Sequence, residues 1–241
     1  MSFLHDTAQW LDSIRIIHLF ASPTIIGDVL PILLKGAWLT ISYSLLGQLF
    51  GIPLGIVAAV MKISRFRTLR ALSTVYTDFF RGTPLLVQIL IAMYALPIAI
   101  PNLRLMIPNY DMVGGVAVLG VNSGAYVAEI FRAGIESIHK GQMEAARSLG
   151  FSYLGAMRYI ILPQTFRRVL PPLTNEFIAL LKDSSLLSVV ALPELAQQAR
   201  NVSAWKANQS PFFGAALIYL AMTLPLTRLV AYMERRLAVS D

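Results

Sequence analysis

Long apolar runs with almost no charge constrain the fold of this chain more than any other feature. Residues 30–61 contain a single charged residue, Lys35. A helix of about 20 apolar residues crosses the hydrocarbon core of a bilayer. The chain is 56% hydrophobic and only 14% charged, whereas a soluble domain is about 25% charged. The sequence therefore predicts an all-α polytopic membrane protein.

The apolar runs predict about five transmembrane helices. We expect them near residues 30–61, 72–96, 112–131, 173–190 and 212–232. Pro163 is expected to break the chain before the fourth run, and Pro171 and Pro172 to make its start irregular. Glycines at four-residue spacing on the first run predict a face that packs closely on another helix, namely Gly47, Gly51 and Gly55.

The basic residues give the topology. The segments at 62–70, at 132–168 and after the last run hold 12 of the 20 Lys and Arg residues, and the predicted external segments hold 4. Because basic residues concentrate on the cytosolic side, we expect the N-terminus outside and the C-terminus in the cytosol. The same bias explains the net charge of +7 without a nucleic-acid partner.

The sequence contains no residue pattern typical of a disulfide-rich protein, a metal site or an enzyme. The chain has no Cys and three isolated His, so neither a disulfide framework nor a metal site is expected. It has no glycine-rich nucleotide loop and no catalytic motif. We therefore expect a transport subunit and not an enzyme, with no cofactor of its own. Residues 1–27 are expected to form an amphipathic or flexible lead-in, and residues 237–241 a tail.

Charged and polar residues interrupt the second, third and fourth runs. In a span, an ionisable residue indicates a functional site by default. The second run also contains Gly82-Thr83-Pro84, where the proline frees a carbonyl near Phe80. Structural pairs remain an alternative: Arg81 with Asp78, Lys182 with Asp183, and Glu129 with Arg132 or Lys182.

The predicted cytosolic segment 132–168 contains a short polar helix at 141–152. Ala145, Ala146 and Leu149 share one face of it, and Glu144 and Arg147 line the other. A left-handed Gly150 is expected to end the helix. Such a short helix is not stable alone, so it needs the membrane surface or a partner protein.

The spacing of this segment resembles the signature loop of permease subunits of bacterial ATP-binding-cassette importers. Seven fixed positions match: Glu144, Ala145, Ala146, Gly150, Ile160, Leu162 and Pro163. Residues 28–236 resemble the branch that imports polar amino acids such as histidine, arginine, glutamine and glutamate. Four stretches carry that likeness: Lys35-Gly36-Ala37 with Thr40, Phe80-Arg81-Gly82-Thr83-Pro84-Leu85, residues 125–135, and Leu181-Lys182-Asp183-Ser184-Ser185-Leu186.

The resemblance implies a transmembrane permease domain at 28–236 in a bacterial inner membrane. Its expected partners are a second permease subunit, two ATPase subunits that bind ATP and Mg, an external amino-acid-binding protein and membrane lipid. Transport would proceed by alternating access. The residues expected to couple to the ATPase are Glu144, Ala145, Ala146, Leu149 and Gly150.

An amino acid carries a carboxylate and an ammonium group, and both need partners when they leave water. The residues expected to line its path are Arg81, Thr83, Gln88, Asn122, Glu129, Asp183 and Ser184. Counting residues from Leu72 and Leu173 predicts that Arg81 and Asp183 lie at a similar depth. The alternative function is an ion-coupled secondary transporter or channel that uses Arg81, Glu129 and Asp183 as a relay.

Overall fold

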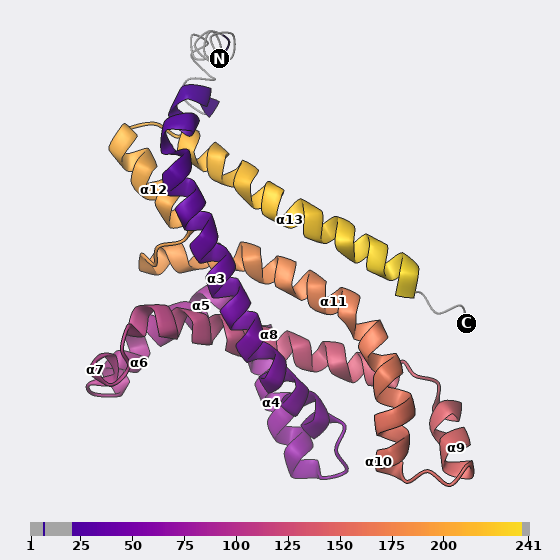
Figure 1. Cartoon of the computed structure of the whole chain (residues 1–241). Coiled ribbons are helices and arrows are strands. Elements are labelled where there is room, and N and C mark those ends of the chain that lie inside the picture. Colours follow the sequence, from indigo (N-terminus) through magenta and orange to yellow (C-terminus); the bar gives the residue numbers. More distant parts are fainter. Residues whose placement is uncertain (1–6, 8–20, 238–241) are drawn as a thin grey trace. The chain divides into compact units, whose positions relative to one another are not determined.

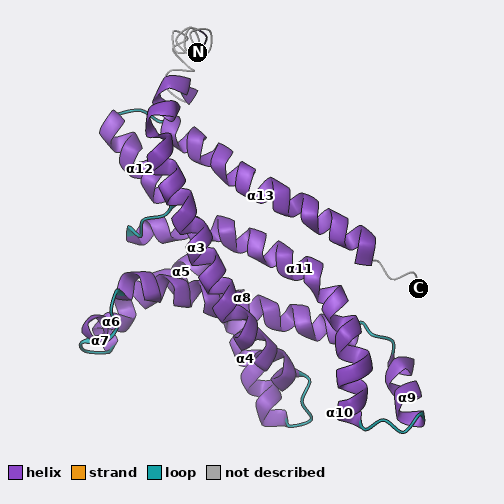
Figure 2. Cartoon of the chain, in the orientation of Figure 1, coloured by secondary structure: helices purple, strands orange, loops and turns teal. Residues whose placement is uncertain are grey.

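The computed structural model describes Thr7 and residues 21–237. Within this part of the chain every regular element is a helix, and loops connect the helices (Figures 1 and 2). The predicted all-α fold is confirmed. Most of the lead-in predicted at 1–27, and most of the tail predicted at 237–241, lie outside the described residues.

Three described helices are long and apolar enough to cross a membrane. They are α3 (Pro23–Lys62), α8 (Tyr110–Glu136) and α13 (Ser210–Leu237). A fourth candidate is a bent pair, formed by α4 (Arg67–Gly82) and the helical segment Leu85–Ala99. The number of spans beyond these stays a prediction.

Shorter helices fill most of the chain between the long ones. The segment after α4 comprises α5 (Leu85–Leu90), the π-helix η1 (Ile91–Ala95), α6 (Leu96–Ala99) and α7 (Leu103–Met106). The segment between α8 and α13 comprises α9 (Lys140–Ser148), α10 (Tyr153–Ala156), the π-helix η2 (Met157–Ile161), α11 (Leu162–Asp183), the 3-10 helix η3 (Ser184–Val190) and α12 (Leu195–Lys206).

The chain forms two compact units, which are described separately. The first unit comprises Met1–Leu45, Ile89–Val116 and Leu181–Pro225. Its core joins apolar residues at every fourth position of α3 to the inner face of α12: Val29, Leu33 and Ala37 with Leu195, Ala199 and Val202. A Cβ atom on Gly36 would lie 2.9 Å from the Cα atom of Leu195, so α3 and α12 approach too closely for a side chain there.

The second unit comprises Leu46–Gln88, Ala117–Leu180 and Leu226–Asp241. In it, the glycine face of α3 packs on α8. A Cβ atom on Gly51 would lie 2.8 Å from the carbonyl oxygen of Gly120, and one on Gly55 would lie 2.5 Å from Cγ1 of Val127. The predicted packing of the glycine face on another helix is confirmed, because only glycine allows the two backbones to come this close.

The predicted break at Pro163 is wrong. The π-helix η2 runs directly into α11, which contains Pro163 as its second residue and continues through Pro171 and Pro172. A proline interrupts an α-helix because it lacks an N–H group and its ring meets the carbonyl of residue i−4. The wider π turn that precedes Pro163 relieves both conflicts.

Candidate functional site

The second unit contains an interruption between α4 and α5. Thr83 has an extended conformation, with ψ 146°, as the residue before a proline usually does. The helical segments on either side are bent by 103°. The interruption predicted at Gly82-Thr83-Pro84 is therefore present, as a sharp bend in the backbone.

Two side-chain amides satisfy the carbonyl that Pro84 leaves unpaired. Gln88 Nε2 donates to the Phe80 oxygen at 2.9 Å, and Asn122 Nδ2 of α8 donates to the same oxygen at 3.0 Å. Gln88 Nε2 also donates to the hydroxyl of Thr83 at 2.9 Å, and its Oε1 accepts from Asn122 at 2.9 Å. Gln88 and Asn122 are each 6% exposed, so this network is a buried brace that fixes the bend.

Arg81 comes just before the bend and faces Glu129. Its Nη1 lies 4.0 Å from Glu129 Oε1, and its guanidinium carbon lies 5.3 Å from the centre of the Tyr126 ring. Among the described residues, no salt bridge joins Arg81 to Asp78. That alternative is not adopted, because the guanidinium turns toward α8.

Glu129 collects several cations from three helices. Lys62, the last residue of α3, pairs with its Oε1. Arg132, three residues further along α8, pairs with its Oε2 at 2.8 Å. The predicted pairing of Glu129 with Arg132 is confirmed, and Lys62 joins it. The Glu129 side chain is only 15% exposed, so these cations compensate a carboxylate that is largely removed from water.

A pocket of about 440 Å³ opens beside this cluster within the second unit. Arg81 and Glu129 line it together with Tyr126 and Arg168. The rest of the lining is small or apolar and includes Ile130, Ala133, Gly134 and Pro172. A mainly apolar pocket with a few charged groups is the usual form of a small-molecule site.

Asp183 and Ser184 belong to the first unit. Asp183 is exposed and ends α11, and Ser184 is buried with its hydroxyl donating to the Leu181 oxygen at 2.9 Å. In the described part of the chain no salt bridge joins Lys182 to Asp183. The depth predicted for Arg81 and Asp183 assumed helices that start at Leu72 and Leu173, whereas α4 begins at Arg67 and α11 at Leu162.

The short polar helix is present as α9. His139 caps it, because the ring nitrogen Nδ1 accepts from the backbone N–H of Gly141 at 3.1 Å. Gly150 follows its end with φ +85°, so the predicted left-handed glycine is confirmed. Ala146 is buried, whereas Leu149 is 78% exposed and Ala145 is exposed. Of the three residues predicted to share a face, only Ala146 turns inward, and Ala145 and Leu149 face away from the packed side.

Alpha helix α9 also has support within its own chain. It packs on η2 and α10, and a pocket of about 440 Å³ lies beside it, lined by His139, Met143, Tyr153 and other residues. Glu144, Ala145 and Leu149 remain exposed on its outer side. One side of α9 is thus packed against its own chain, and the opposite side is exposed.

Sequence reasoning missed several residues that complete these sites. The basic segment at 62–70 predicts only a cytosolic position for Lys62, whereas Lys62 ends α3 and pairs with Glu129. Tyr126 and Arg168 line the pocket with Arg81, and neither has a distinctive local pattern. Only the stretch at residues 125–135 pointed toward Tyr126. No group of three or more His, Asp or Glu that could hold a metal occurs among the described residues.

Comparisons with known proteins give one consistent family. The family of binding-protein-dependent transport system inner membrane components matches residues 51–239. The chain is 39% identical to a probable glutamine ABC transporter permease protein, GlnM of Bacillus subtilis (strain 168), over 90% of this chain and 98% of that protein. It is 36% identical to the glutamine transport system permease protein GlnP of Escherichia coli (strain K12), over 89% of this chain and 96% of that protein.

Further relatives agree. The arginine transport system permease protein ArtQ of Bacillus subtilis (strain 168) is 38% identical over 88% of this chain and 95% of its own length. The crystal structure of an amino acid ABC transporter with histidines has a TM-score of 0.79 and 37% identity, and covers 87% of this chain and 96% of its own. The chain therefore belongs to the family of inner membrane components of binding-protein-dependent transport systems, among the permeases of ABC transporters.

Proposed function

We propose that this chain is the membrane-spanning subunit that carries a polar amino acid into the cytosol in an ATP-driven importer. The observation that carries the proposal is the complete signature loop on an exposed helix, α9, in a chain whose relatives are named for glutamine and arginine transport. The chain has no nucleotide loop of its own, so it needs an ATPase in a separate subunit.

The proposed assembly contains two permease subunits, two ATPase subunits that bind ATP and Mg, and an external amino-acid-binding protein. The N-terminus lies outside and the C-terminus in the cytosol of a bacterial inner membrane. The distribution of basic residues supports this orientation. Alternating access, driven by closure of the ATPase dimer, moves the substrate.

Helix α9 is the proposed contact with the ATPase. Its inner side is fixed by Ala146 and by packing on η2 and α10. Its outer side offers Glu144, Ala145 and Leu149. A helix that is anchored on one side and free on the other can pass a displacement of its partner to the spans as a rigid body. Gly150 sets the direction in which the chain leaves the helix, because its φ of +85° suits only glycine without strain.

The proposed substrate path starts from the pocket beside Arg81. The planar guanidinium of Arg81 suits a carboxylate, and Glu129 suits an ammonium group. Thr83, Gln88 and Asn122 act by holding the bend that positions Arg81. Asp183 and Ser184 are proposed as further polar groups of the path.

The first experiment tests the coupling helix. The chain is reconstituted in vesicles with its ATPase subunit and the external binding protein, and uptake of labelled glutamine and arginine is measured beside ATP hydrolysis. Gly150→Asp and Glu144→Ala should lower uptake while hydrolysis continues. Gly155→Ala is the matched control, since Gly155 lies in the neighbouring α10 and has no left-handed φ. Parental uptake by Gly150→Asp would remove the basis for this contact.

The second experiment tests the path. Arg81→Gln and Asp183→Asn should lower uptake far more than they lower membrane insertion or basal ATP hydrolysis. Arg65→Gln serves as the control, since Arg65 lies in the loop between α3 and α4. If both variants import at the parental rate and apparent affinity, these charges are structural and the path lies elsewhere.

A further inference from the structure

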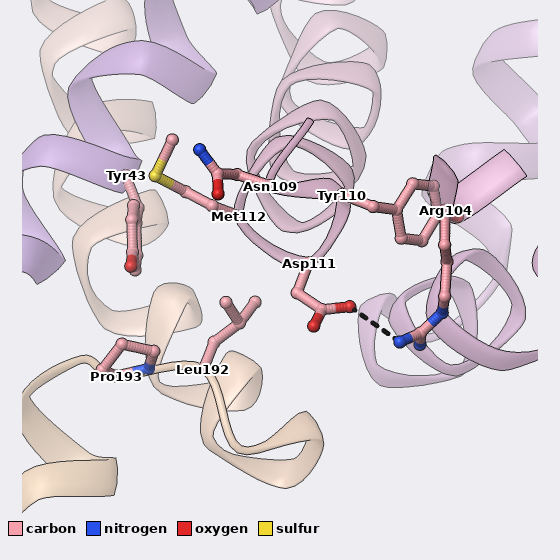
Figure 3. Close-up of a pocket in the computed structure, with 8 residues that line it drawn as sticks. All are labelled: Tyr43, Arg104, Asn109, Tyr110, Asp111, Met112, Leu192 and Pro193. Carbon is pink, nitrogen blue, oxygen red and sulfur yellow. Dashed lines mark ion pairs between the residues drawn. The ribbon is translucent and has the colours of Figure 1, made fainter. Parts of the chain in front are cut away.

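The first unit contains a pocket that the proposed path does not use. Its volume is about 550 Å³, within the usual range for small-molecule sites. Three parts of the chain form it: α3, the stretch from α7 into α8, and the loop between η3 and α12. The lining residues are Tyr43, Arg104, Asn109, Tyr110, Asp111, Met112, Leu192 and Pro193. In Figure 3, Tyr43, Asp111, Met112, Leu192 and Pro193 surround a common space, and Arg104 meets Asp111.

A proline fixes the arginine of this pocket. Pro97 follows the π-helix η1 and cannot donate a hydrogen bond to the carbonyls behind it. Arg104 Nη2 donates to one of these carbonyls, on Met93, at 3.0 Å. The hydroxyl of Tyr110 donates to the preceding carbonyl, on Ala92, at 2.5 Å. Both residues are therefore tied to the backbone that the proline interrupts.

Two further contacts orient the guanidinium of Arg104. Its carbon lies 5.6 Å from the centre of the Tyr110 ring, and Nη1 lies 3.3 Å from Asp111 Oδ1. A guanidinium has five N–H donors, and the contact to Met93 and the pair with Asp111 occupy only part of them. The arginine is thus held in place with donors to spare.

The Arg104–Asp111 pair is easily opened by a ligand. The two side chains are 50% and 57% exposed, and exposed pairs of this kind contribute little to stability. The pocket therefore places a cation and an anion side by side, and Tyr43, Met112 and Leu192 line the rest of it. Such a pocket matches a small molecule that carries both charges. A free α-amino acid has this pattern, with its carboxylate and ammonium group on one carbon.

We infer that this pocket is a second amino-acid site, in which Arg104 binds the α-carboxylate and Asp111 binds the α-ammonium. On the predicted topology α7 and the loop after η3 face the outside, so this site is open to substrate that arrives from outside. This inference rests on the proposed function. Because the charged groups are half-exposed, the site binds weakly and releases readily.

The test measures direct binding of labelled L-glutamine to the permease–ATPase complex in lipid nanodiscs, without ATP or external binding protein. An Arg81→Gln background removes the proposed site beside Arg81, and the remaining saturable binding reports the pocket of Arg104 and Asp111. Adding Arg104→Gln or Asp111→Asn should weaken this binding about tenfold or more. Adding Lys206→Gln should leave it unchanged, because the pair of Lys206 with Asp28 at 3.7 Å is in the same unit but does not line the pocket.

Competition by analogues of glutamine is a second test of the two charged contacts. Glutamine without its carboxylate, or without its amino group, should fail to compete, because each lacks one of the two charges. The paired exchange Arg104→Asp with Asp111→Arg restores an ion pair but takes the guanidinium away from the Met93 oxygen. The double variant should still fold, because the exposed pair contributes little to stability, whereas binding should not return.

Several outcomes would overturn the inference. These are no saturable binding below about 10 mM in the Arg81→Gln background, equal binding by the Arg104 and Asp111 variants, equal competition by an analogue with one charge, or binding restored by the exchange. Unchanged glutamine binding combined with loss of stimulation by the external protein would identify a docking contact instead. If the parental complex does not import amino acids at all, the proposed function fails, and that result is separate from these.

Discussion

Lys62 and Glu129 form an ion pair across 67 positions of the sequence. Lys62 Nζ also donates to the hydroxyl of Thr77 at 2.7 Å, so the end of α3 is tied both to α8 and to α4. Arg132 Nε donates to the other oxygen of the carboxylate at 2.9 Å. One carboxylate thus joins three helices of the second unit, and it has little water around it.

The first prediction concerns this carboxylate. Glu129→Gln should lower the free energy of unfolding by about 1–3 kcal/mol, because Lys62 is left with little water and no anion. Glu136→Gln is the control: Glu136 also pairs with Arg132, but its side chain is 56% exposed, so its loss should cost less than about 1 kcal/mol. Thermal unfolding in detergent measures both. Equal losses of unfolding free energy in the two variants would show that the Glu129 carboxylate does not hold the three helices together.

The second prediction concerns the bend at Pro84. Pro84→Ala restores a backbone N–H that can donate to the Phe80 oxygen, so α4 and α5 should straighten. Proline inside a helix costs about 3 kcal/mol relative to alanine, but Pro84 lies between α4 and α5, so the free energy of unfolding should change by less than this. Uptake should be slower, because the proline no longer enforces the bend. Measurements of thermal unfolding and uptake test the two effects.

A double-mutant cycle sharpens this test. Gln88→Leu should destabilise the parent more than it destabilises Pro84→Ala, because in the latter the backbone N–H replaces the amide that Gln88 gives to Phe80. Identical losses in the two backgrounds, or full uptake by Pro84→Ala, would contradict a functional bend.

The third prediction concerns the glycine face. Gly51→Ala places a Cβ atom 2.8 Å from the Gly120 oxygen, so the helices must separate, at a cost of about 1–3 kcal/mol. Gly27→Ala is the matched control in the same helix, since a Cβ atom there meets nothing within 4 Å. It should stabilise by up to about 1 kcal/mol through helix propensity. Thermal unfolding measures both variants. If their unfolding midpoints shifted by the same amount, the close packing of α3 on α8 would be contradicted.

The fourth prediction concerns a buried carboxyl outside the spans. Glu194 caps α12 by accepting from the backbone N–H groups of Gln197 at 2.6 Å and Ala196 at 2.9 Å. The hydroxyl of Tyr219 also donates to it at 2.9 Å. Burial raises the pKa of the Glu194 carboxyl above its ordinary value, and these hydrogen bonds offset the rise only in part.

A raised pKa means that the folded protein holds this proton more tightly than the unfolded chain. The stability that protonated Glu194 contributes is complete below the ordinary pKa of a glutamate. It is lost as pH rises through the pKa of Glu194 in the folded protein. The unfolding midpoint should therefore fall as pH rises above about 4.3, with a smaller fall in Glu194→Gln. The same pH profile in both proteins would contradict this.

The fifth prediction concerns orientation. The chain has no cysteine, so single cysteines can be labelled without background. Leu105→Cys, at an 84% exposed position of α7, should react with an impermeant external reagent in intact cells. Ser148→Cys, at an exposed position of α9, should react only after the membrane is opened. The reverse pattern would overturn the predicted topology.

The sequence alone determined the features that depend on local composition and short spacing. The apolar runs predicted the membrane class and all-α fold, Gly-Thr-Pro predicted an interruption before Leu85, and the position of Gly150 predicted a left-handed residue, which has φ +85°. The spacing of the signature loop led to the family that the comparisons confirm. These features are readable because the residues that cause them are neighbours along the chain.

Only the tertiary structure decided which distant polar residues interact. In the fold, Glu129 pairs with Lys62 as well as with Arg132, and Arg81 lies near Glu129 and forms no salt bridge with Asp78 in the described part of the chain. Gln88 and Asn122 donate hydrogen bonds to the Phe80 carbonyl. Pattern alone cannot choose among such partners, because each charge has several candidates at allowed spacing. The choice depends on which side chains the packed helices bring within hydrogen-bonding distance, and that distance is a property of the fold.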